Sequence, residues 1–248
     1  MTKIIAHRGY ASKYPENTKS AFESAYQEQA DGIEIDVHLS KDGEVVICHD
    51  DRIDRTSNGS GFIYEYNLEQ LKGFDFAANF ESNDEYQKKA EEKIMTLQEY
   101  FEWAKDKDLI TNIELKTSTV KNDGIEEMVN KIIVNYQQER SVIISSFNHK
   151  SILKMKKENP GISCGFLTMH NLLDPEQYCR KYSVEYYHPN HLMIDEELVK
   201  NCKNSNTGLN IWTLNDAESI KEMLPLGLTS IITDDPKMAV KIVKSHKL

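Results

Sequence analysis

Residues 32–38 read Gly-Ile-Glu-Ile-Asp-Val-His, and residues 45–50 follow with Val-Val-Ile-Cys-His-Asp. Both runs are rich in β-branched residues, which favours strands. Side chains alternate between the two faces of a strand, so Glu34 and Asp36 share one face. The polar linker between the two runs is too short for a parallel crossover. We therefore predict an antiparallel hairpin that returns His49 to the level of Asp36, at the carboxyl end of the first strand.

Short β-rich runs recur along the whole chain, and most are separated by polar segments with helical character. We expect barrel strands near residues 3–6, 33–39, 111–115, 141–145, 163–167, 184–187, 208–213 and 229–232. Helical spacing places one apolar stripe on residues 17–29 and another on residues 96–107. The pattern predicts an α/β fold, a TIM (β/α)8 barrel, whose active site lies at the carboxyl ends of the strands.

Acidic side chains on two of the expected strands indicate a metal site. Glu34 and Asp36 lie side by side and repel each other unless a cation lies between them. Alternation along Ile113-Glu114-Leu115-Lys116 adds a third carboxylate and a lysine on one face. Hard oxygen ligands favour Mg²⁺ or Ca²⁺, and no cysteine or histidine spacing indicates zinc. An anionic phosphoryl group fits a space surrounded by such an ion, Arg8 and the lysine.

Two histidines complete the set of candidate residues. His7 ends the first β-rich run, directly before Arg8, and His49 ends the hairpin. Cleavage of a phosphodiester needs one group to take a proton and another to give one, and histidine titrates in the range suited to both. A single histidine after a strand is more often structural, but the joint pattern favours a catalytic pair. His38 shares the carboxylate face of its strand, and we expect it at the rim without a direct role.

Length, charge and cysteine usage restrict the remaining possibilities. The 248 residues fit one barrel domain, 1–248. The net charge of -10 argues against nucleic acid and anionic membranes as partners. The four cysteines show no metal-ligand spacing, the N-terminus lacks a signal-peptide core, and no apolar run approaches the roughly 20 residues that span a bilayer. We expect a cytoplasmic protein with reduced thiols, a small-molecule substrate and no stable membrane insertion; the oligomeric state stays open.

The order of the motifs resembles the glycerophosphodiester phosphodiesterase family over nearly the whole chain. The matching segments are His7-Arg8-Gly9, Pro15-Glu16-Asn17-Thr18, Glu34-Ile35-Asp36-Val37, Lys41-Asp42-Gly43, His49-Asp50, Asp54-Arg55-Thr56, Ile113-Glu114-Leu115-Lys116, Ser146-Phe147, Trp212-Thr213-Leu214-Asn215 and Thr233-Asp234. The resemblance implies a barrel of the phosphatidylinositol-phospholipase-like type with one bound divalent ion, Ca²⁺ or Mg²⁺. The positions that match the family's metal ligands are Glu34, Asp36 and Glu114.

The resemblance also implies the remaining roles and the reaction. His7 and His49 match the acid/base pair. Arg8 and Lys116 match phosphate contacts, and Trp212 matches an aromatic wall beside the glycerol group. The implied reaction converts glycerophosphocholine, glycerophosphoethanolamine and similar diesters to sn-glycerol 3-phosphate and an alcohol. The glycerol 2-hydroxyl would attack phosphorus first, and water would then open the cyclic phosphate.

Residues 51–94 form the one stretch that the barrel pattern does not explain. The stretch mixes aromatic and charged residues, and long connections in compact folds are usually functional or mobile. We interpret it as a small insertion that caps the barrel mouth and shapes selection of the leaving alcohol. The alternative is a surface excursion whose aromatic residues only cover the barrel top.

Other functions fit parts of the pattern. A lysophospholipase D-like or cyclising phospholipase on the same barrel would use the same residues, but the sequence shows no obvious apolar rim or amphipathic membrane helix. A barrel that only binds metal or phosphate would not need both histidines. A carboxylate-metal isomerase would leave the histidines and Arg8 unused. The sequence does not show which alcohol leaves, which ion is bound or which histidine acts first.

Overall fold

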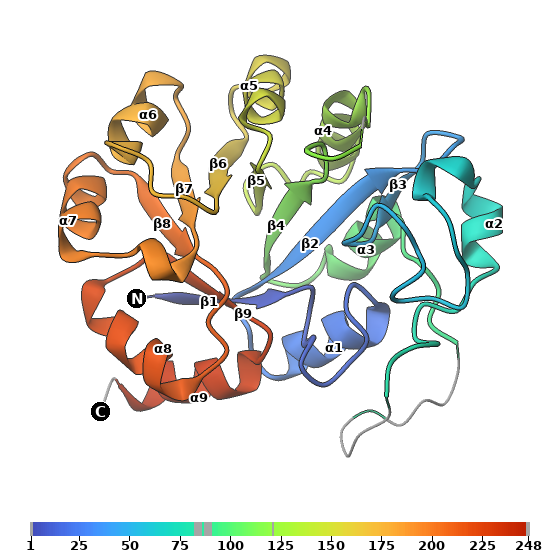
Figure 1. Cartoon of the computed structure of the whole chain (residues 1–248), viewed down its shortest axis with the longest axis horizontal. Coiled ribbons are helices and arrows are strands. Elements are labelled where there is room, and N and C mark those ends of the chain that lie inside the picture. Colours follow the sequence, from blue (N-terminus) through green and yellow to red (C-terminus); the bar gives the residue numbers. More distant parts are fainter. Residues whose placement is uncertain (1, 82–85, 87–90, 121, 247–248) are drawn as a thin grey trace.

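The computed structural model describes residues 2–81, 86, 91–120 and 122–246. Within them, eight parallel strands form a barrel: β1 (Lys3–His7), β2 (Gly32–Leu39), β4 (Ile110–Leu115), β5 (Val142–Ser146), β6 (Ser163–Thr168), β7 (Tyr186–Pro189), β8 (Gly208–Ile211) and β9 (Ser230–Thr233). The sheet order β1-β9-β8-β7-β6-β5-β4-β2, together with the pairing of β1 with β2, closes the barrel (Figure 1). The predicted TIM barrel is confirmed, and each expected strand position holds a strand.

Helices surround the barrel (Figure 1). They are α1 (Lys19–Gln27), α2 (Leu68–Lys72), α3 (Leu97–Ala104), α4 (Ile125–Asn135), α5 (His149–Glu158), α6 (Pro175–Lys181), α7 (Glu196–Asn204), α8 (Ala217–Met223) and α9 (Pro236–Ser245), with 3₁₀ turns η1 (Ile63–Glu65), η2 (His191–Met193) and η3 (Leu224–Leu226). Both predicted helices are present, and their first turns explain why. Thr18 caps α1, and Thr96 forms a reciprocal capping box with Glu99 at the start of α3. No helix in the described ranges is both long and apolar enough to cross a bilayer.

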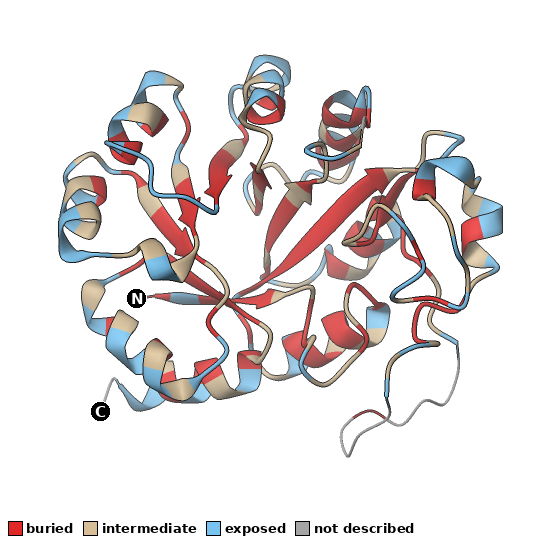
Figure 2. Cartoon of the chain, in the orientation of Figure 1, coloured by how far each residue is buried: buried red, intermediate tan, exposed pale blue. Residues whose placement is uncertain are grey.

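The alternation along β2 separates the core from the site. Ile33, Ile35 and Val37 are 0% exposed and belong to the apolar layer between the strands and the helices. Figure 2 shows β2 as buried along its length. Glu34 and Asp36 point to the opposite face, into the barrel, and they are also buried. The same strand therefore places apolar residues against the surrounding helices and ionisable residues inside the barrel.

The predicted hairpin forms after β2. Strand β3 (Val45–Ile47) pairs antiparallel with β2 and places Ile47 opposite Val37. The Cys48 amide donates to the Asp36 carbonyl at 3.0 Å. His49 consequently returns to the level of Asp36, as the short linker predicted.

Residues 51–94 lie beside this hairpin. Residues 82–85 and 87–90 of the stretch fall outside the described residues. The apolar side chains of the insertion form a second small core with those of β3, made of Val46, Cys48, Ile53, Ile63, Leu71, Phe76 and Ile94. Figure 1 shows α2 and its loops on the outer side of β3. None of the insertion's described residues is among those that line the cavity at the barrel mouth, and its part in selecting the leaving alcohol stays a prediction.

Candidate active site

Three carboxylates converge at the carboxyl end of the barrel. Glu34 and Asp36 come from β2, and Glu114 comes from β4, where the strand register pairs it with Asp36. One oxygen atom from each side chain lies within 4.8 Å of the others. The structure thus brings together the three acids that the sequence singled out.

The three carboxylates are crowded together and mostly buried. Burial, together with the charges of Asp36 and Glu114, raises the pKa of Glu34 well above its usual range. Burial opposes ionisation of Asp36 too, but Lys116 and Arg8 outweigh it and lower the pKa of Asp36. Within the described residues, Asp36 Oδ1 is buried and makes no hydrogen bond. Crowded oxygen donors, one of them a buried oxygen without a hydrogen bond, fit a hard divalent cation such as Ca²⁺ or Mg²⁺.

Two cationic side chains flank the acids. Lys116 Nζ lies 2.9 Å from Glu114 Oε1 and 3.3 Å from Asp36 Oδ1. Arg8 Nε lies 3.4 Å from Asp36 Oδ2 on the other side. The lysine and the arginine therefore pair with different oxygens of the same carboxylate, and both lie close to the place where an anionic group could bind.

A left-handed turn after β1 directs Arg8 toward the acids. Arg8 has a φ of 56° and Gly9 a φ of 84°. A Cβ at Gly9 would lie 2.7 Å from the backbone of Ala21, so only glycine fits this close approach of the turn to α1. The turn also allows the Arg8 backbone N–H to donate to Glu34 Oε2 at 3.1 Å.

His7 ends β1 opposite Glu34 and is held by a carboxylate. Its Nδ1 donates to Asp234 Oδ1 at 2.6 Å, and its Nε2 lies 3.9 Å from Glu34 Oε2. Asn215 fixes Asp234 in turn, because its side-chain oxygen accepts from the Asp234 backbone N–H at 2.9 Å and its amide donates to the carboxylate. The Nε2 atom therefore faces the cavity and is available for proton transfer.

His49 is held in the same way from the hairpin. Its Nδ1 donates to Asp50 Oδ1 at 2.6 Å, and Asp50 Oδ2 accepts from Arg55 Nε at 2.7 Å. The His49 carbonyl accepts from His38 Nε2 at 3.3 Å. His38 is 1% exposed, and burial lowers its pKa to about 4. The expectation of a rim position for His38 is therefore wrong, because the returning hairpin covers it.

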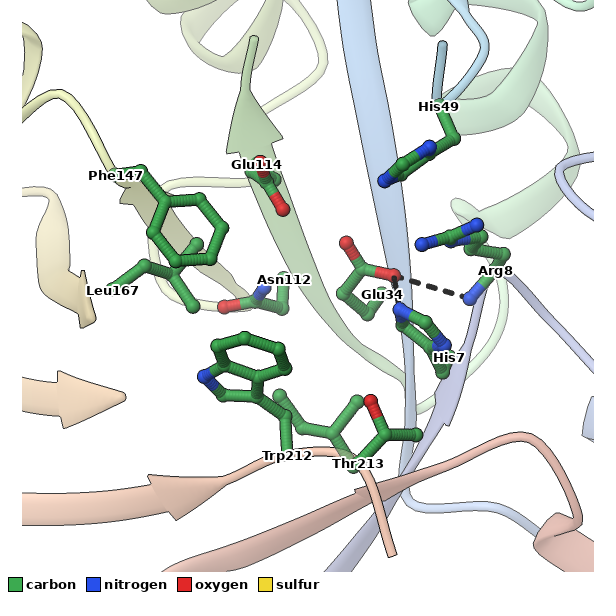
Figure 3. A pocket seen from close by; sticks show the side chains of 11 residues that line it. His7, Arg8, Glu34, His49, Asn112, Glu114, Phe147, Leu167, Trp212 and Thr213 are labelled. Carbon is green, nitrogen blue, oxygen red and sulfur yellow. Dashed lines mark hydrogen bonds and ion pairs between the residues drawn. The ribbon is translucent and has the colours of Figure 1, made fainter. Parts of the chain in front are cut away.

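These side chains surround one cavity of about 140 Å³ (Figure 3). The lining residues are His7, Arg8, Glu34, His49, Asn112, Glu114, Phe147, Leu167, Trp212, Thr213 and Ile232. Figure 3 shows the histidines and Arg8 on one side of Glu34, with an apolar wall across from them. In that wall the Trp212 and Phe147 rings meet edge to face, with centroids 5.5 Å apart.

Each residue proposed from the sequence lies at this cavity or against it. Lys116 contacts the lining carboxylate of Glu114, and Asp36 pairs with Lys116 and lies within 4.8 Å of the other two carboxylates. The Trp212 indole N–H donates to the His188 carbonyl at 2.8 Å, which fixes the ring as a wall. The arrangement offers two proton-transfer groups, a cation site and an anion site in one small space, and this combination suits phosphodiester cleavage.

Comparison with known proteins identifies the family of the chain. The model of the glycerophosphoryl diester phosphodiesterase family matches residues 7–238. The chain belongs to this family. Membership makes the protein a phosphoric diester hydrolase.

Relatives match the chain over its full length. A glycerophosphodiester phosphodiesterase from Caldanaerobacter subterraneus subsp. tengcongensis is 42% identical over 243 residues, which cover 98% of each chain. One from Bacillus altitudinis is 38% identical over 250 residues and covers 100% of each. The fold is also similar to a phosphodiesterase from Oleispira antarctica solved in complex with the product sn-glycerol-3-phosphate, with a TM-score of 0.87, 28% identity and coverage of 98% and 97%.

The sequence assigned no role to several residues of this glycerophosphoryl diester phosphodiesterase family member that contact the site. These are Glu16, Asn17, Asp50, Arg55, Asn112 and Asp234. Except for Asn112, all of them belong to the motif segments that carried the resemblance. The sequence therefore pointed to these positions, but it did not indicate which residues they contact. His7 and Asp234 are separated by 227 positions, and only closure of the barrel brings them together. The Asn112 amide lines the cavity and donates to Ser145 Oγ at 3.1 Å.

Proposed function

We propose that this protein hydrolyses glycerophosphodiesters to sn-glycerol 3-phosphate and an alcohol, with the help of one divalent ion. One observation carries the proposal: His7 and His49 face the same cavity as Arg8, Glu34 and Glu114. The names of the relatives and the product bound in the Oleispira antarctica structure support the substrate class.

The three acidic residues would hold the ion. Glu34, Asp36 and Glu114 would supply the oxygen ligands, and a bound Ca²⁺ or Mg²⁺ would polarise the phosphoryl oxygens. Arg8 and Lys116 would bind the same phosphoryl group. These local cations matter because the net charge of -10 would otherwise repel an anionic substrate.

The two histidines would move the protons. One takes the proton of the glycerol 2-hydroxyl as that oxygen bonds to phosphorus, and the other gives a proton to the departing alcohol oxygen. The product is a cyclic phosphate, which water opens with the proton transfers reversed. Because a carboxylate fixes each Nδ1–H, each ring presents Nε2 to the cavity, where such transfers take place.

Trp212 and its neighbours would bind the carbon skeleton. Phe147, Leu167 and Trp212 form an apolar surface opposite the histidines, suited to the CH₂ groups of glycerol. The proposal includes a small-molecule substrate, no nucleic-acid partner and a cytoplasmic location. The four cysteines are buried and unpaired, which suits a reducing compartment.

A lysophospholipase D-like activity is the second candidate, and one observation favours it. Leu173 is 95% exposed and Leu192 is 76% exposed, in the connections that follow β6 and β7 at the carboxyl side of the barrel. The sequence had shown no obvious apolar rim. Exposed leucines at this edge could contact an acyl chain.

One assay separates the two candidates. Glycerol 3-phosphate release from glycerophosphocholine is measured with a chelator, and again after Ca²⁺ or Mg²⁺ is restored. Choline release from lysophosphatidylcholine is measured in parallel. Metal-dependent turnover of glycerophosphocholine supports the first candidate, and turnover of the lysolipid alone supports the second. If neither substrate reacts with either ion, both proposals fail.

A further inference from the structure

Arg55 does not line the cavity, but it binds two carboxylates that contact residues of the cavity. Its Nη1 and Nη2 donate to the two oxygens of Glu16 at 2.8 and 2.7 Å. Its Nε and Nη2 donate to the two oxygens of Asp50 at 2.7 and 3.2 Å. A planar guanidinium with several fixed N–H donors is suited to hold two carboxylates at once, which a lysine is not. We call Glu16, Asp50 and Arg55 the arginine clamp.

Each carboxylate of the clamp also accepts a hydrogen bond from a side chain that lines the cavity. Glu16 Oε1 accepts from Arg8 Nη1 at 3.0 Å. Asp50 Oδ1 accepts from His49 Nδ1 at 2.6 Å. Arg8 comes from the turn after β1 and His49 from the end of the hairpin, so the clamp connects two parts of the site that belong to different elements.

The insertion holds the backbone of the clamp in place. The Asn79 side-chain amide donates to the carbonyls of Asp54, Arg55 and Ser57, at 3.1, 3.2 and 2.9 Å. Ile53 on the same loop is 0% exposed and belongs to the second small core. The loop that carries Arg55 is thus anchored by other residues of the insertion.

We propose that Arg55 is a positioning residue that couples the phosphate contact Arg8 to the proton-transfer residue His49. Anchoring this clamp is then a role of the insertion. Without the guanidinium, the negative charges of Glu16 and Asp50 would repel each other, and each would pull its own partner to a new position. The inference rests on the proposed function, because it assigns Arg8 and His49 their roles in that reaction.

The exposure of Arg55 allows this role to be separated from folding. Its side chain is 50% exposed, so its replacement leaves no cavity in the core, and a urea titration records any loss of stability separately from activity. Arg52 offers a matched control on the same loop. It is 47% exposed and pairs with Asp54, and no contact with Glu16 or Asp50 is among its described interactions.

Single substitutions test the direction of the effect. We expect Arg55→Gln to lower kcat/KM for glycerophosphocholine by about 10- to 100-fold, by analogy with the loss of a residue that orients a metal ligand. Arg55→Lys should recover only part of the loss, since an ammonium group cannot bind both carboxylates in the same plane. Arg52→Gln should leave kcat/KM and the urea midpoint unchanged. All variants should retain a wild-type urea midpoint.

A double-mutant cycle tests the coupling itself. We expect the effects of Glu16→Gln and Asp50→Asn on kcat/KM to be non-additive by at least about threefold in the wild-type background. In the Arg55→Gln background the coupling should change sign, because each substitution then relieves the direct repulsion between the two carboxylates. A merely structural arginine would not produce this change in coupling.

The same cycle is measured on the affinity for glycerol 3-phosphate by calorimetry, which does not require turnover. If the wild type does not hydrolyse glycerophosphocholine, the proposed function fails. The role of Arg55 is still tested, because the non-additivity of Glu16→Gln and Asp50→Asn is also measured on the affinity for glycerol 3-phosphate. Additive effects of Glu16→Gln and Asp50→Asn with Arg55 present would overturn the inference. So would an Arg55→Gln variant with wild-type affinity and kcat/KM.

Discussion

His7 Nδ1 and Asp234 Oδ1 meet at 2.6 Å, although the two residues stand near opposite ends of the chain. The contact forms because β1 pairs with β9, where His7 is the last residue of β1 and Asp234 directly follows β9. A carboxylate accepts only, so it fixes the proton of the His7 ring on Nδ1. The cavity-facing Nε2 is thereby left as the atom that exchanges protons.

Asp234→Asn should leave the fold intact and lower kcat. The amide can donate to Nδ1 as well as accept from it, so the ring is no longer held in one tautomer. We expect a loss of about 10²- to 10⁴-fold in kcat for glycerophosphocholine, the range for loss of a general acid or base. Asp216→Asn, at the exposed start of α8, is the matched control with unchanged kcat. A near-wild-type kcat for Asp234→Asn would remove the carboxylate from the mechanism.

Metal binding should appear as a change in thermal stability. An ion that binds only the folded state stabilises it by mass action. We expect Ca²⁺ or Mg²⁺ to raise the Tm of the wild type above its value in chelator, and Glu114→Gln to abolish most of that increase. In chelator, Glu34→Gln should have a Tm equal to or above the wild type, because burial and the neighbouring carboxylates disfavour a charge there. Equal metal-dependent shifts in wild type and Glu114→Gln would argue against this ligand set.

Trp212→Ala should act on substrate binding more than on the chemical step. The indole lies opposite the histidines and transfers no proton, so its loss should raise KM by up to about tenfold, in line with about 0.8 kcal/mol for each CH₂ group that it buries. Trp103→Ala, on α3 away from the cavity, is a control for the loss of a tryptophan. A fall in kcat with unchanged KM would place Trp212 in the chemistry instead.

Much of the architecture could be predicted from local sequence. The β-branched runs indicated the strands, because a strand's pattern depends on its own residues. The short linker before Val45 predicted the hairpin for a steric reason, and alternation along β2 placed Glu34 and Asp36 together. The convergence of these acids with Glu114 followed once the strands were parallel neighbours.

The contacts that hold the site could not be predicted in the same way. The pairing of His7 with Asp234 depends on closure of the barrel between distant segments. The clamp depends on the path of a loop, which no periodicity specifies. The aromatic residues of the insertion indicated burial but not their partners, and the structure packs Phe76 into a core of its own beside β3.

His188 should make stability depend on pH below neutrality. It is 0% exposed inside the barrel, its Nε2 accepts from the Asn210 amide at 2.9 Å, and burial lowers its pKa to about 3. The unfolded chain binds a proton near pH 6.5 and the folded chain does not. The stabilising contribution is therefore complete above about pH 6.5, and it is lost progressively as the pH falls toward 3.

The free energy of unfolding from urea titrations at pH 7.5 and pH 5 measures this contribution. One histidine with these pKa values should account for about 2 kcal/mol of the loss at pH 5. His188→Gln keeps an acceptor for Asn210 and cannot titrate, so its stability should fall by about 2 kcal/mol less than that of the wild type over the same interval. For each protein, the free energy of unfolding at pH 5 is subtracted from the value at pH 7.5. A packing defect caused by the glutamine lowers both values equally and cancels in this difference. An equal loss in both proteins would show that His188 is protonated in the folded barrel as readily as in the unfolded chain.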